Sequence, residues 1–222
     1  MTIRLAGACL AVAAAVLAAG AGAASAAAPH AGTMLQRLNA VENDAEAIAE
    51  GEVTGARARA AAARAASAWR AIRPGIAASR ADASVPIIDA AVAALGADRD
   101  PGQLRRDANE VTGAIAPLFT LAGEGIPVEI HLLDYLGRSI ALDARAADWP
   151  RATADAAALS RNWSALRPLV VQRARGPAAA AAYDRVTRAI AESVGGRRTA
   201  PVLAAATRSA AQVDVLESLF GG

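Results

Sequence analysis

The sequence predicts an all-α protein in which two tandem, related four-helix units follow an N-terminal signal peptide. Three observations lead to this prediction. Alanine, the strongest helix former, accounts for 66 of the 222 residues. Apolar positions recur at helical spacing in eight segments, and one of these segments resembles another that lies 94 positions later. Aromatic residues make up only 3% of the chain, which disfavours a β-sandwich.

The first 26 residues have the pattern of a secretory signal peptide. A cationic start over residues 1–4 precedes an apolar stretch over residues 5–19, and Ala24-Ser25-Ala26 forms a small-x-small cleavage site. We therefore expect residues 1–26 to be removed and the protein to be exported, either to the periplasm or to the extracellular space. Residues 27–32 are then expected to form a flexible start of the mature chain.

An uncleaved anchor helix is the alternative, because residues 5–28 are long enough to span a bilayer. With cleavage, we expect no stable membrane span in the mature chain. The single cysteine, Cys9, lies in this leader and precedes most of the apolar stretch, whereas a lipid-attached cysteine should follow it. The mature chain then has no disulfide, thiolate metal site or cysteine nucleophile, so helix packing alone must stabilise it.

The charge of the mature chain is nearly balanced. All 23 cationic side chains are arginines, and 22 of them remain after the leader beside 21 acidic side chains. Such a balance lacks the basic excess of a nucleic-acid-binding surface. We therefore expect no nucleic-acid partner, but an unknown exported protein or a small ligand.

The first four-helix unit is expected over residues 33–122. Thr54 is the expected N-cap of its second helix, Pro74 the expected stop, and Asp100-Pro101 opens the fourth helix with a capping residue before a proline. The second helix has a bundle seam with alternating steps of four and three residues, at Ala58, Ala62, Ala65, Trp69 and Ile72. The four helices are expected at about 33–51, 54–74, 85–95 and from 100 onward.

The second unit is expected over residues 126–221. Its first helix opens at Pro127, its second is capped by Asp148 and ends before Pro168, and its third follows Pro177. The third helix has a stripe that includes Tyr183, and the last helix follows Thr199. The expected ranges are about 127–144, 148–167, 177–194 and 199–220.

A shift of 94 positions aligns the second helix with the sixth without a gap. It gives 10 identities in 28 positions, six of them alanine pairs that carry little weight in this composition. The alternative is convergence of two alanine-rich bundle seams. The informative matches are Arg57 with Arg151, Trp69 with Trp163, Arg73 with Arg167, Pro74 with Pro168 and, at a shift of 95, Asp89 with Asp184.

Both tryptophans lie within the seam one turn before an Arg-Pro pair. We expect Trp69 and Trp163 to be structural core residues, because a large ring among alanines fills space that small side chains leave. A platform for stacking a ligand is the alternative. Arg73 and Arg167 are expected to interact with the negative ends of their helix dipoles.

The densest polar cluster follows Pro127 in the fifth helix. On a helix, His131, Asp134 and Arg138 share the face opposite the leucines, at spacings that let the acid contact both cations. We expect a solvated face here. A ligand site is the alternative if this face is buried, because a carboxylate orients an imidazole and raises its basicity. The speculative ligand-binding residues are Glu129, His131, Asp134, Tyr135 and Arg138.

No cofactor and no metal site is expected. One histidine in this cluster is too few for zinc, which usually takes three or more protein ligands. Haem would need an axial pair from Met34, His30 and His131, and no Cys-x-x-Cys-His is present. Seven aromatic residues also leave few large groups to enclose a macrocycle.

Catalytic signatures are also absent. The chain has no Gly-x-Ser-x-Gly, no His-Glu-x-x-His and no phosphate-binding glycine-rich loop after a strand. We therefore expect an exported, non-enzymatic helical-bundle protein that binds an unknown ligand or acts as a scaffold. The alternative is a metal- or cofactor-responsive periplasmic binding protein that uses the region around His131.

The strings Leu133-Asp-Tyr-Leu-Gly-Arg138 and Trp163-x-x-Leu-Arg-Pro168 resemble segments of poorly characterised exported bacterial proteins of all-helical build. This resemblance implies an exported helical protein and no particular activity. The duplicated bundle is also similar in general shape to iron-regulated exported proteins of the imelysin type. Their Gly-x-His-x-x-Glu signature is missing, because Glu129 precedes His131 at the matching place and Asp134 follows it.

Overall fold

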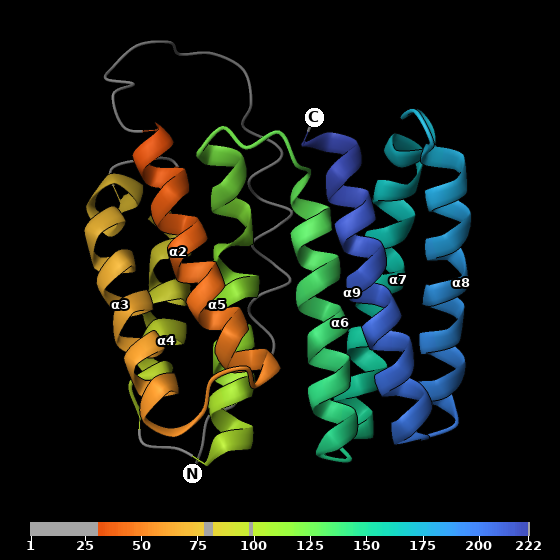
Figure 1. Ribbon diagram of the computed structural model, residues 1–222, viewed down its shortest axis with the longest axis horizontal. Helices are drawn as coiled ribbons and strands as arrows, with labels where there is room; N and C mark the ends of the chain where they lie inside the picture. The colour runs from red at the N-terminus through yellow and green to blue at the C-terminus, as the bar shows by residue number, and fades with distance from the viewer. Residues whose placement is uncertain (1–30, 78–81, 98–99, 222) are drawn as a thin grey trace. The chain divides into compact units, whose positions relative to one another are not determined.

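The computed structural model describes residues 31–77, 82–97 and 100–221. Within these ranges the chain forms eight α-helices, one short 3-10 helix and no strand, which confirms the all-α prediction (Figure 1). The expected signal peptide at 1–26 and residues 27–30 of the expected flexible segment lie outside the described residues.

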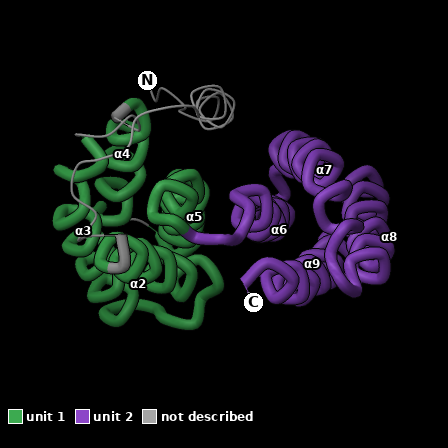
Figure 2. Tube along the Cα trace, turned by 90° about the horizontal axis from the view of Figure 1, so that it is seen from above, with its two compact units in different colours: residues 1–123 green, residues 124–222 purple. Residues whose placement is uncertain are grey.

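The chain divides into two compact units after Gly123 (Figure 2). In unit 1, α2 packs against α3 and α5, and α4 packs against the same two helices, so the four form a closed ring. A short 3-10 helix, η1, precedes α4. The elements of unit 1 are α2 (Ala31–Glu50), α3 (Gly55–Ala77), η1 (Asp82–Ser84), α4 (Val85–Leu95) and α5 (Pro101–Leu121).

Unit 2 has the same ring order. Helix α6 packs against α7 and α9, and α8 packs against α7 and α9. In both units, therefore, each helix contacts its neighbours along the chain and the fourth helix contacts the first. The helices of unit 2 are α6 (Val128–Arg145), α7 (Trp149–Val171), α8 (Gly176–Gly195) and α9 (Thr199–Phe220).

Each unit has its own apolar core, in which a tryptophan lies among alanines and branched aliphatic side chains. Trp69 is 2% exposed in the core of unit 1, and Trp163 is 4% exposed in the core of unit 2. In unit 2 the ring of Tyr183 packs beside Trp163, with the ring centroids 4.7 Å apart. Burial of such a ring removes a large apolar area from water, so each tryptophan is a major contributor to its core.

Aspartates cap two of the helices that the sequence marks with turn signals. The Asp100 carboxylate accepts hydrogen bonds from the backbone N–H groups of Gly102 and Gln103, both at 3.0 Å. The Asp148 carboxylate accepts one from the N–H of Arg151 at 3.3 Å. Both caps satisfy N–H groups that have no partner within the helix.

The expectation that Pro74 and Pro168 end their helices is wrong. Both prolines lie inside helices, since α3 continues to Ala77 and α7 to Val171. A proline removes one backbone donor, but the residues that follow it here are held by the core. Ile76 is 1% exposed and Val170 is fully buried, so their burial offsets the lost hydrogen bond.

None of the helices in the described ranges is both long and apolar enough to cross a membrane.

Candidate functional site

The structure buries the polar face of α6 that was expected to be solvated. His131 is 9% exposed, and its Nε2 atom lies 2.7 Å from Oε2 of Glu124. Glu124 precedes α6 in the turn that opens unit 2, and its side chain is 17% exposed. The expectation of a solvated His131 is therefore wrong. The carboxylate of Glu124, seven residues earlier, is a hydrogen-bond partner for the imidazole and so reduces the cost of burying it.

Asp134 and Arg138 pair along the same helix. Oδ2 of Asp134 lies 2.7 Å from Nη2 of Arg138, at the i, i+4 spacing that the sequence indicated. Their side chains are 21% and 11% exposed, so this ion pair is more sheltered than a typical surface pair. The guanidinium and carboxylate partly neutralise each other.

Glu129 and Tyr135 have different surroundings from the ion pairs. Glu129 is in the first turn of α6, where its negative charge interacts favourably with the positive end of the helix dipole. Its backbone carbonyl accepts a hydrogen bond from the side chain of Asn162 on α7 at 2.6 Å. Tyr135 is half-buried and packs against the core of unit 2. Among the described residues, no group of three or more histidine, cysteine or acidic side chains gathers in a way that could hold a metal ion.

A second polar cluster, which the sequence pattern did not indicate, lies between α6 and α7. It consists of Ser139 and Asp143 on α6 and Arg151 and Asp155 on α7. The Ser139 hydroxyl donates to Oδ2 of Asp155 at 2.5 Å. Asp143 is 2% exposed, and its Oδ2 atom has no hydrogen-bond partner.

Burial raises the pKa of Asp143 to about 7, because a charged carboxylate is poorly solvated in this place. Arg151 opposes this effect, but its Nε atom is 3.7 Å from Oδ1 and its side chain is 35% exposed. The charges of Asp155 and Asp148, and a hydrogen bond with Asp155, raise the pKa of Asp143 further. This carboxyl group therefore titrates near neutral pH.

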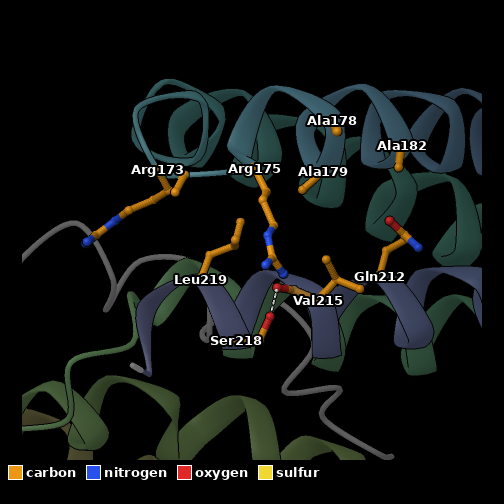
Figure 3. A pocket seen from close by; sticks show the side chains of 10 residues that line it. Arg173, Arg175, Ala178, Ala179, Ala182, Gln212, Val215, Ser218 and Leu219 are labelled. Carbon is orange, nitrogen blue, oxygen red and sulfur yellow. Dashed lines mark hydrogen bonds between the residues drawn. The ribbon is translucent and has the colours of Figure 1, made fainter.

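An open groove of about 670 Å³ lies on unit 2 between the start of α8 and the end of α9 (Figure 3). Its α8 wall is made of alanines, and its α9 wall carries Val215, which is 41% exposed, and Leu219. Arg175 reaches from the start of α8 toward Val215 and Ser218 on α9, as Figure 3 shows. The lining residues are Arg173, Ala174, Arg175, Ala178, Ala179, Ala182, Gln212, Val215, Ser218 and Leu219.

Two arginines give this groove its charge. The guanidinium carbon of Arg173 lies 4.4 Å from the centre of the Phe220 ring, a cation–π contact that positions it beside the groove. Within the part of the chain that the structure describes, no carboxylate or carbonyl group pairs with the Arg175 side chain. The groove thus combines an apolar wall with a cation, Arg175, that has no counter-charge among the residues that the structure describes.

The turn between α7 and α8 holds both arginines in place. Arg175 has a left-handed backbone with φ of 64°, which is costly for a residue with a Cβ atom. The N–H of Gly176 donates to the carbonyl of Arg173 at 2.9 Å. A Cβ atom at Gly176 would lie 1.8 Å from the carbonyl oxygen of Val170, so only glycine fits there.

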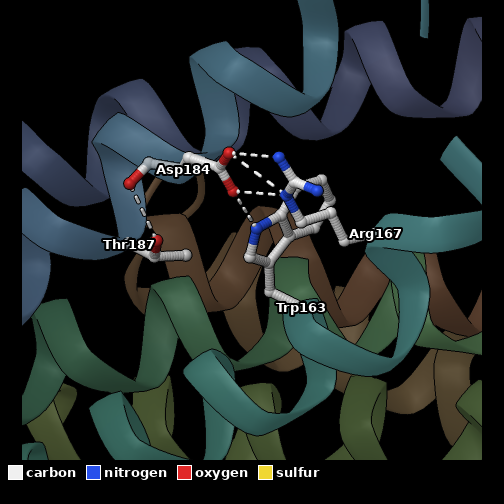
Figure 4. A network of polar contacts seen from close by, with 4 residues as sticks. All are labelled: Trp163, Arg167, Asp184 and Thr187. Carbon is white, nitrogen blue, oxygen red and sulfur yellow. Dashed lines mark hydrogen bonds and ion pairs between the residues drawn. The ribbon is translucent and has the colours of Figure 1, made fainter. Parts of the chain in front are cut away.

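The two predicted core tryptophans each belong to a three-residue network, and Figure 4 shows the one in unit 2. In unit 2 the indole Nε1 of Trp163 donates to Oδ1 of Asp184 at 2.8 Å, and Nη2 of Arg167 donates to Oδ2 at 2.9 Å. The Nε atom of Arg167 also donates to Oδ1 of Asp184, at 3.0 Å. Asp184 therefore joins α7 to α8 through both an indole and a guanidinium.

Unit 1 contains the same network between α3 and α4. Nε1 of Trp69 donates to Oδ1 of Asp89 at 2.8 Å, and Nη2 of Arg73 donates to Oδ2 at 2.7 Å. The hydrogen bonds from the arginines are the main reason that the pKa values of Asp89 and Asp184 lie below their ordinary value. Arg73 and Arg167, which were expected to interact with helix dipoles, pair instead with acids on the following helix.

Two signals in the sequence could have revealed the missed residues. Asp143 continues the buried seam of α6, three residues after Ile140, so a carboxylate occupies a core position. The string Arg173-Ala-Arg175-Gly176 places two cations directly before a glycine at which α8 begins. Both signals are local and need no alignment.

Comparisons of this chain with protein-family models, with curated proteins and with solved structures gave no match.

Proposed function

We propose that the protein is an exported, non-enzymatic binding protein made of two related four-helix units. We further propose that unit 2 binds an organic anion with an aliphatic chain in the arginine-lined groove. The observation that carries the second proposal is the Arg175 guanidinium, which has no counter-charge among the described residues and faces an apolar wall.

The relationship between the units is supported by their matching networks. Trp69, Arg73 and Asp89 correspond to Trp163, Arg167 and Asp184, with the indole-to-carboxylate distance 2.8 Å in both. A tryptophan, an arginine and an aspartate on two different helices would rarely converge on the same hydrogen bonds by composition alone. The shared ring order of the helices also supports a duplication.

The first helices of the two units can be matched through the lengths of the following loops. The loop between α2 and α3 has four residues, and the loop between α6 and α7 has three. Corresponding residues of the two units are therefore 94 positions apart after these loops and 95 positions apart before them. At a shift of 95, each position of α2 that is described as buried matches a buried position of α6. The pairs are Leu38 with Leu133, Val41 with Leu136, Ala45 with Ile140, Ile48 with Asp143 and Ala49 with Ala144.

The groove suits an anion with an apolar tail for two reasons. A guanidinium binds carboxylates and phosphates with two parallel hydrogen bonds, and Arg173 stands beside Arg175 in the same turn. The alanines of α8 and the exposed Val215 offer an apolar path along which a chain can lie. The volume of about 670 Å³ is within the range of about 300 to 1,000 Å³ that is common for small-molecule sites.

A calorimetric titration of the mature protein with sodium dodecanoate, below its micelle concentration, tests this proposal. We expect saturable binding of dodecanoate and much weaker binding of both acetate, which lacks the chain, and dodecyltrimethylammonium, which has the opposite charge. Equal binding of the carboxylate and the ammonium compound would overturn the proposal, because the arginines would then contribute nothing.

An arginine variant shows whether the groove is the site. Arg175→Gln should weaken dodecanoate binding about tenfold or more, since a hydrogen bond to a charged group contributes about 1.5 to 3 kcal/mol. Arg161→Gln, at an exposed position of α7 in the same unit, is the matched control and should leave the affinity unchanged. Equal affinity of the Arg175→Gln protein and the wild type would place any binding elsewhere.

Export rests on the pattern of residues 1–26, which lies outside the described residues. Fractionation of cells that produce the full chain, followed by N-terminal sequencing of the mature protein, tests it. We expect the protein outside the cytoplasm with Ala27 as its first residue. A product that retains Met1 and stays in the membrane fraction would support the anchor alternative instead.

A further inference from the structure

The buried cluster of Ser139, Asp143, Arg151 and Asp155 has no role in the proposed ligand groove. It lies between α6 and α7, whereas the groove lies between α8 and α9. A buried carboxylate without a full set of hydrogen bonds is costly, so its presence in a well-packed bundle calls for a physical explanation.

Asp143 has three charged neighbours, and two of them are acids. Arg151 on α7 approaches Oδ1 at 3.7 Å, while Asp155 on α7 and Asp148 in the preceding turn add negative charge. From α9, the Thr199 hydroxyl donates to the carbonyl of Ala144, the next residue along α6, at 3.3 Å. The Oδ2 atom of Asp143 is buried and has no hydrogen-bond partner.

A carboxyl group that is buried beside other acids ionises less readily, because poor solvation and the neighbouring negative charges both raise the free energy of its charged form. The Ser139 hydroxyl donates to Oδ2 of Asp155, so it does not stabilise a charge on Asp143. Asp143, with only 2% of its surface exposed and one oxygen unsatisfied, therefore keeps its proton to a higher pH than an exposed carboxyl group does.

We propose that Asp143 holds a proton near neutral pH, and that the contact between α6 and α7 weakens as this proton is lost. Unit 2 is then a pH-sensitive element that is most stable under mildly acidic conditions.

Unit 1 offers an internal comparison, which rests on the proposed relationship between the units. Its residues at the corresponding positions are Ile48, at a shift of 95 from Asp143, and Ala61, at a shift of 94 from Asp155. Both are 1% exposed and belong to the core of unit 1. The same place is therefore apolar in one unit and acidic in the other, while Arg57 and Arg151 are the same residue type.

The direction of the pH effect follows from proton binding. The pKa of Asp143 is raised from an unfolded value of 3.8 to about 7, so the folded chain binds more protons than the unfolded chain between these values. Stability is then greatest below the unfolded value and falls as pH rises toward 7. One proton corresponds to about a tenfold increase in the unfolding equilibrium constant per pH unit in this window.

Urea unfolding of the mature protein between pH 4.5 and pH 8.5, compared with Asp143→Asn, tests the proposal. The variant keeps the shape of the side chain and cannot ionise, so its unfolding constant should lack the rise that the wild type shows up to about pH 7. Because the two proteins contain the same other ionisable groups, the difference between their curves reports on Asp143. Parallel pH curves for the two proteins would overturn the proposal.

Two more proteins complete this experiment. Asp143→Ile with Asp155→Ala carries the residues of unit 1 at the corresponding positions, and it should be more stable than the wild type at pH 8 with no such pH dependence. Asp214→Asn, at an exposed position of α9, is the control and should follow the wild-type curve. If Asp143→Asn loses the pH dependence but the double variant does not, the result supports a protonated Asp143 and contradicts the correspondence between the positions of the two units.

A direct measurement needs no variant to fold. The carboxyl carbon of Asp143 can be followed by NMR in the wild-type protein as pH is changed. We expect its chemical shift to change near pH 7. A midpoint below pH 5 would show an ionised Asp143 at neutral pH and would overturn the proposal.

Discussion

The indole nitrogen of Trp163 lies 2.8 Å from Oδ1 of Asp184, and this single hydrogen bond crosses from α7 to α8. The same carboxylate also receives the guanidinium of Arg167, so a buried ring and an exposed cation share one acid. Unit 1 repeats this relationship between Trp69 and Asp89. The tryptophan therefore contributes to stability both by its apolar area and by a hydrogen bond that fixes the register of two helices.

Replacement of the shared acid should destabilise each unit. Asp89→Ala and Asp184→Ala each leave a buried indole N–H without its acceptor, and an unsatisfied buried donor costs about 1 to 3 kcal/mol. Urea unfolding at pH 7 measures the loss. Asp214→Ala, at an exposed position, is the control and should change stability by less than about 0.5 kcal/mol. A loss in one unit and none in the other would contradict the matching roles.

Removal of the rings should have a larger effect. Trp69→Ala and Trp163→Ala each delete a core side chain, and large-to-small changes of this kind cost about 3 to 5 kcal/mol. Chemical denaturation followed by circular dichroism measures both. Losses below about 1 kcal/mol would indicate that the rings contribute little to the core, and would reopen the ligand-stacking alternative.

Acid should weaken both networks. The pKa values of Asp89 and Asp184 are lowered in the folded protein, mainly by hydrogen bonds from Arg73 and Arg167. Their contribution to stability is present above the unfolded value of 3.8 and is lost as pH falls through the lower folded values. Urea midpoints should therefore fall in the wild type as pH is lowered from about 3.8 to about 2.5, and fall less in Asp184→Asn. An identical acid limb in both proteins would contradict this assignment.

Gly176 should tolerate no side chain. Gly176→Ala places a Cβ atom 1.8 Å from a backbone oxygen, so the turn must shift, and we expect a loss of about 2 kcal/mol or more. Gly195→Ala is the matched control near the other end of α8, where no atom lies within 4 Å of the added Cβ. It should be neutral or slightly stabilising. Equal effects of the two substitutions would show that the turn adapts.

The helical class was predictable because helical spacing and alanine content act locally. The cap at Asp100 was predictable for the same reason, since an acid before a proline satisfies the free N–H groups at the start of α5. The ends at Pro74 and Pro168 were not, because burial of Ile76 and Val170 decides whether a helix continues past a proline. Tertiary packing overrides local propensity there.

The candidate site was less predictable than the fold. The sequence indicated the pair of Asp134 and Arg138, because their spacing on one helix fixes their distance. It did not indicate that Glu124 pairs with His131, since a contact between a turn and a helix depends on the path of the chain. Asp143 and Asp155 meet only when α6 and α7 pack, and no periodicity within one helix reveals such a contact.

The central claim is that the two units are related and that, in each of them, the same hydrogen bond from a tryptophan indole to an aspartate joins the second and third helices. An NMR measurement of the three indole N–H groups in the mature protein tests it most directly. We predict that the N–H protons of Trp69 and Trp163 exchange slowly with solvent and shift together downfield, while that of Trp149, whose indole has no described acceptor, exchanges quickly. Slow exchange for one of the two core rings and fast exchange for the other would contradict the claim.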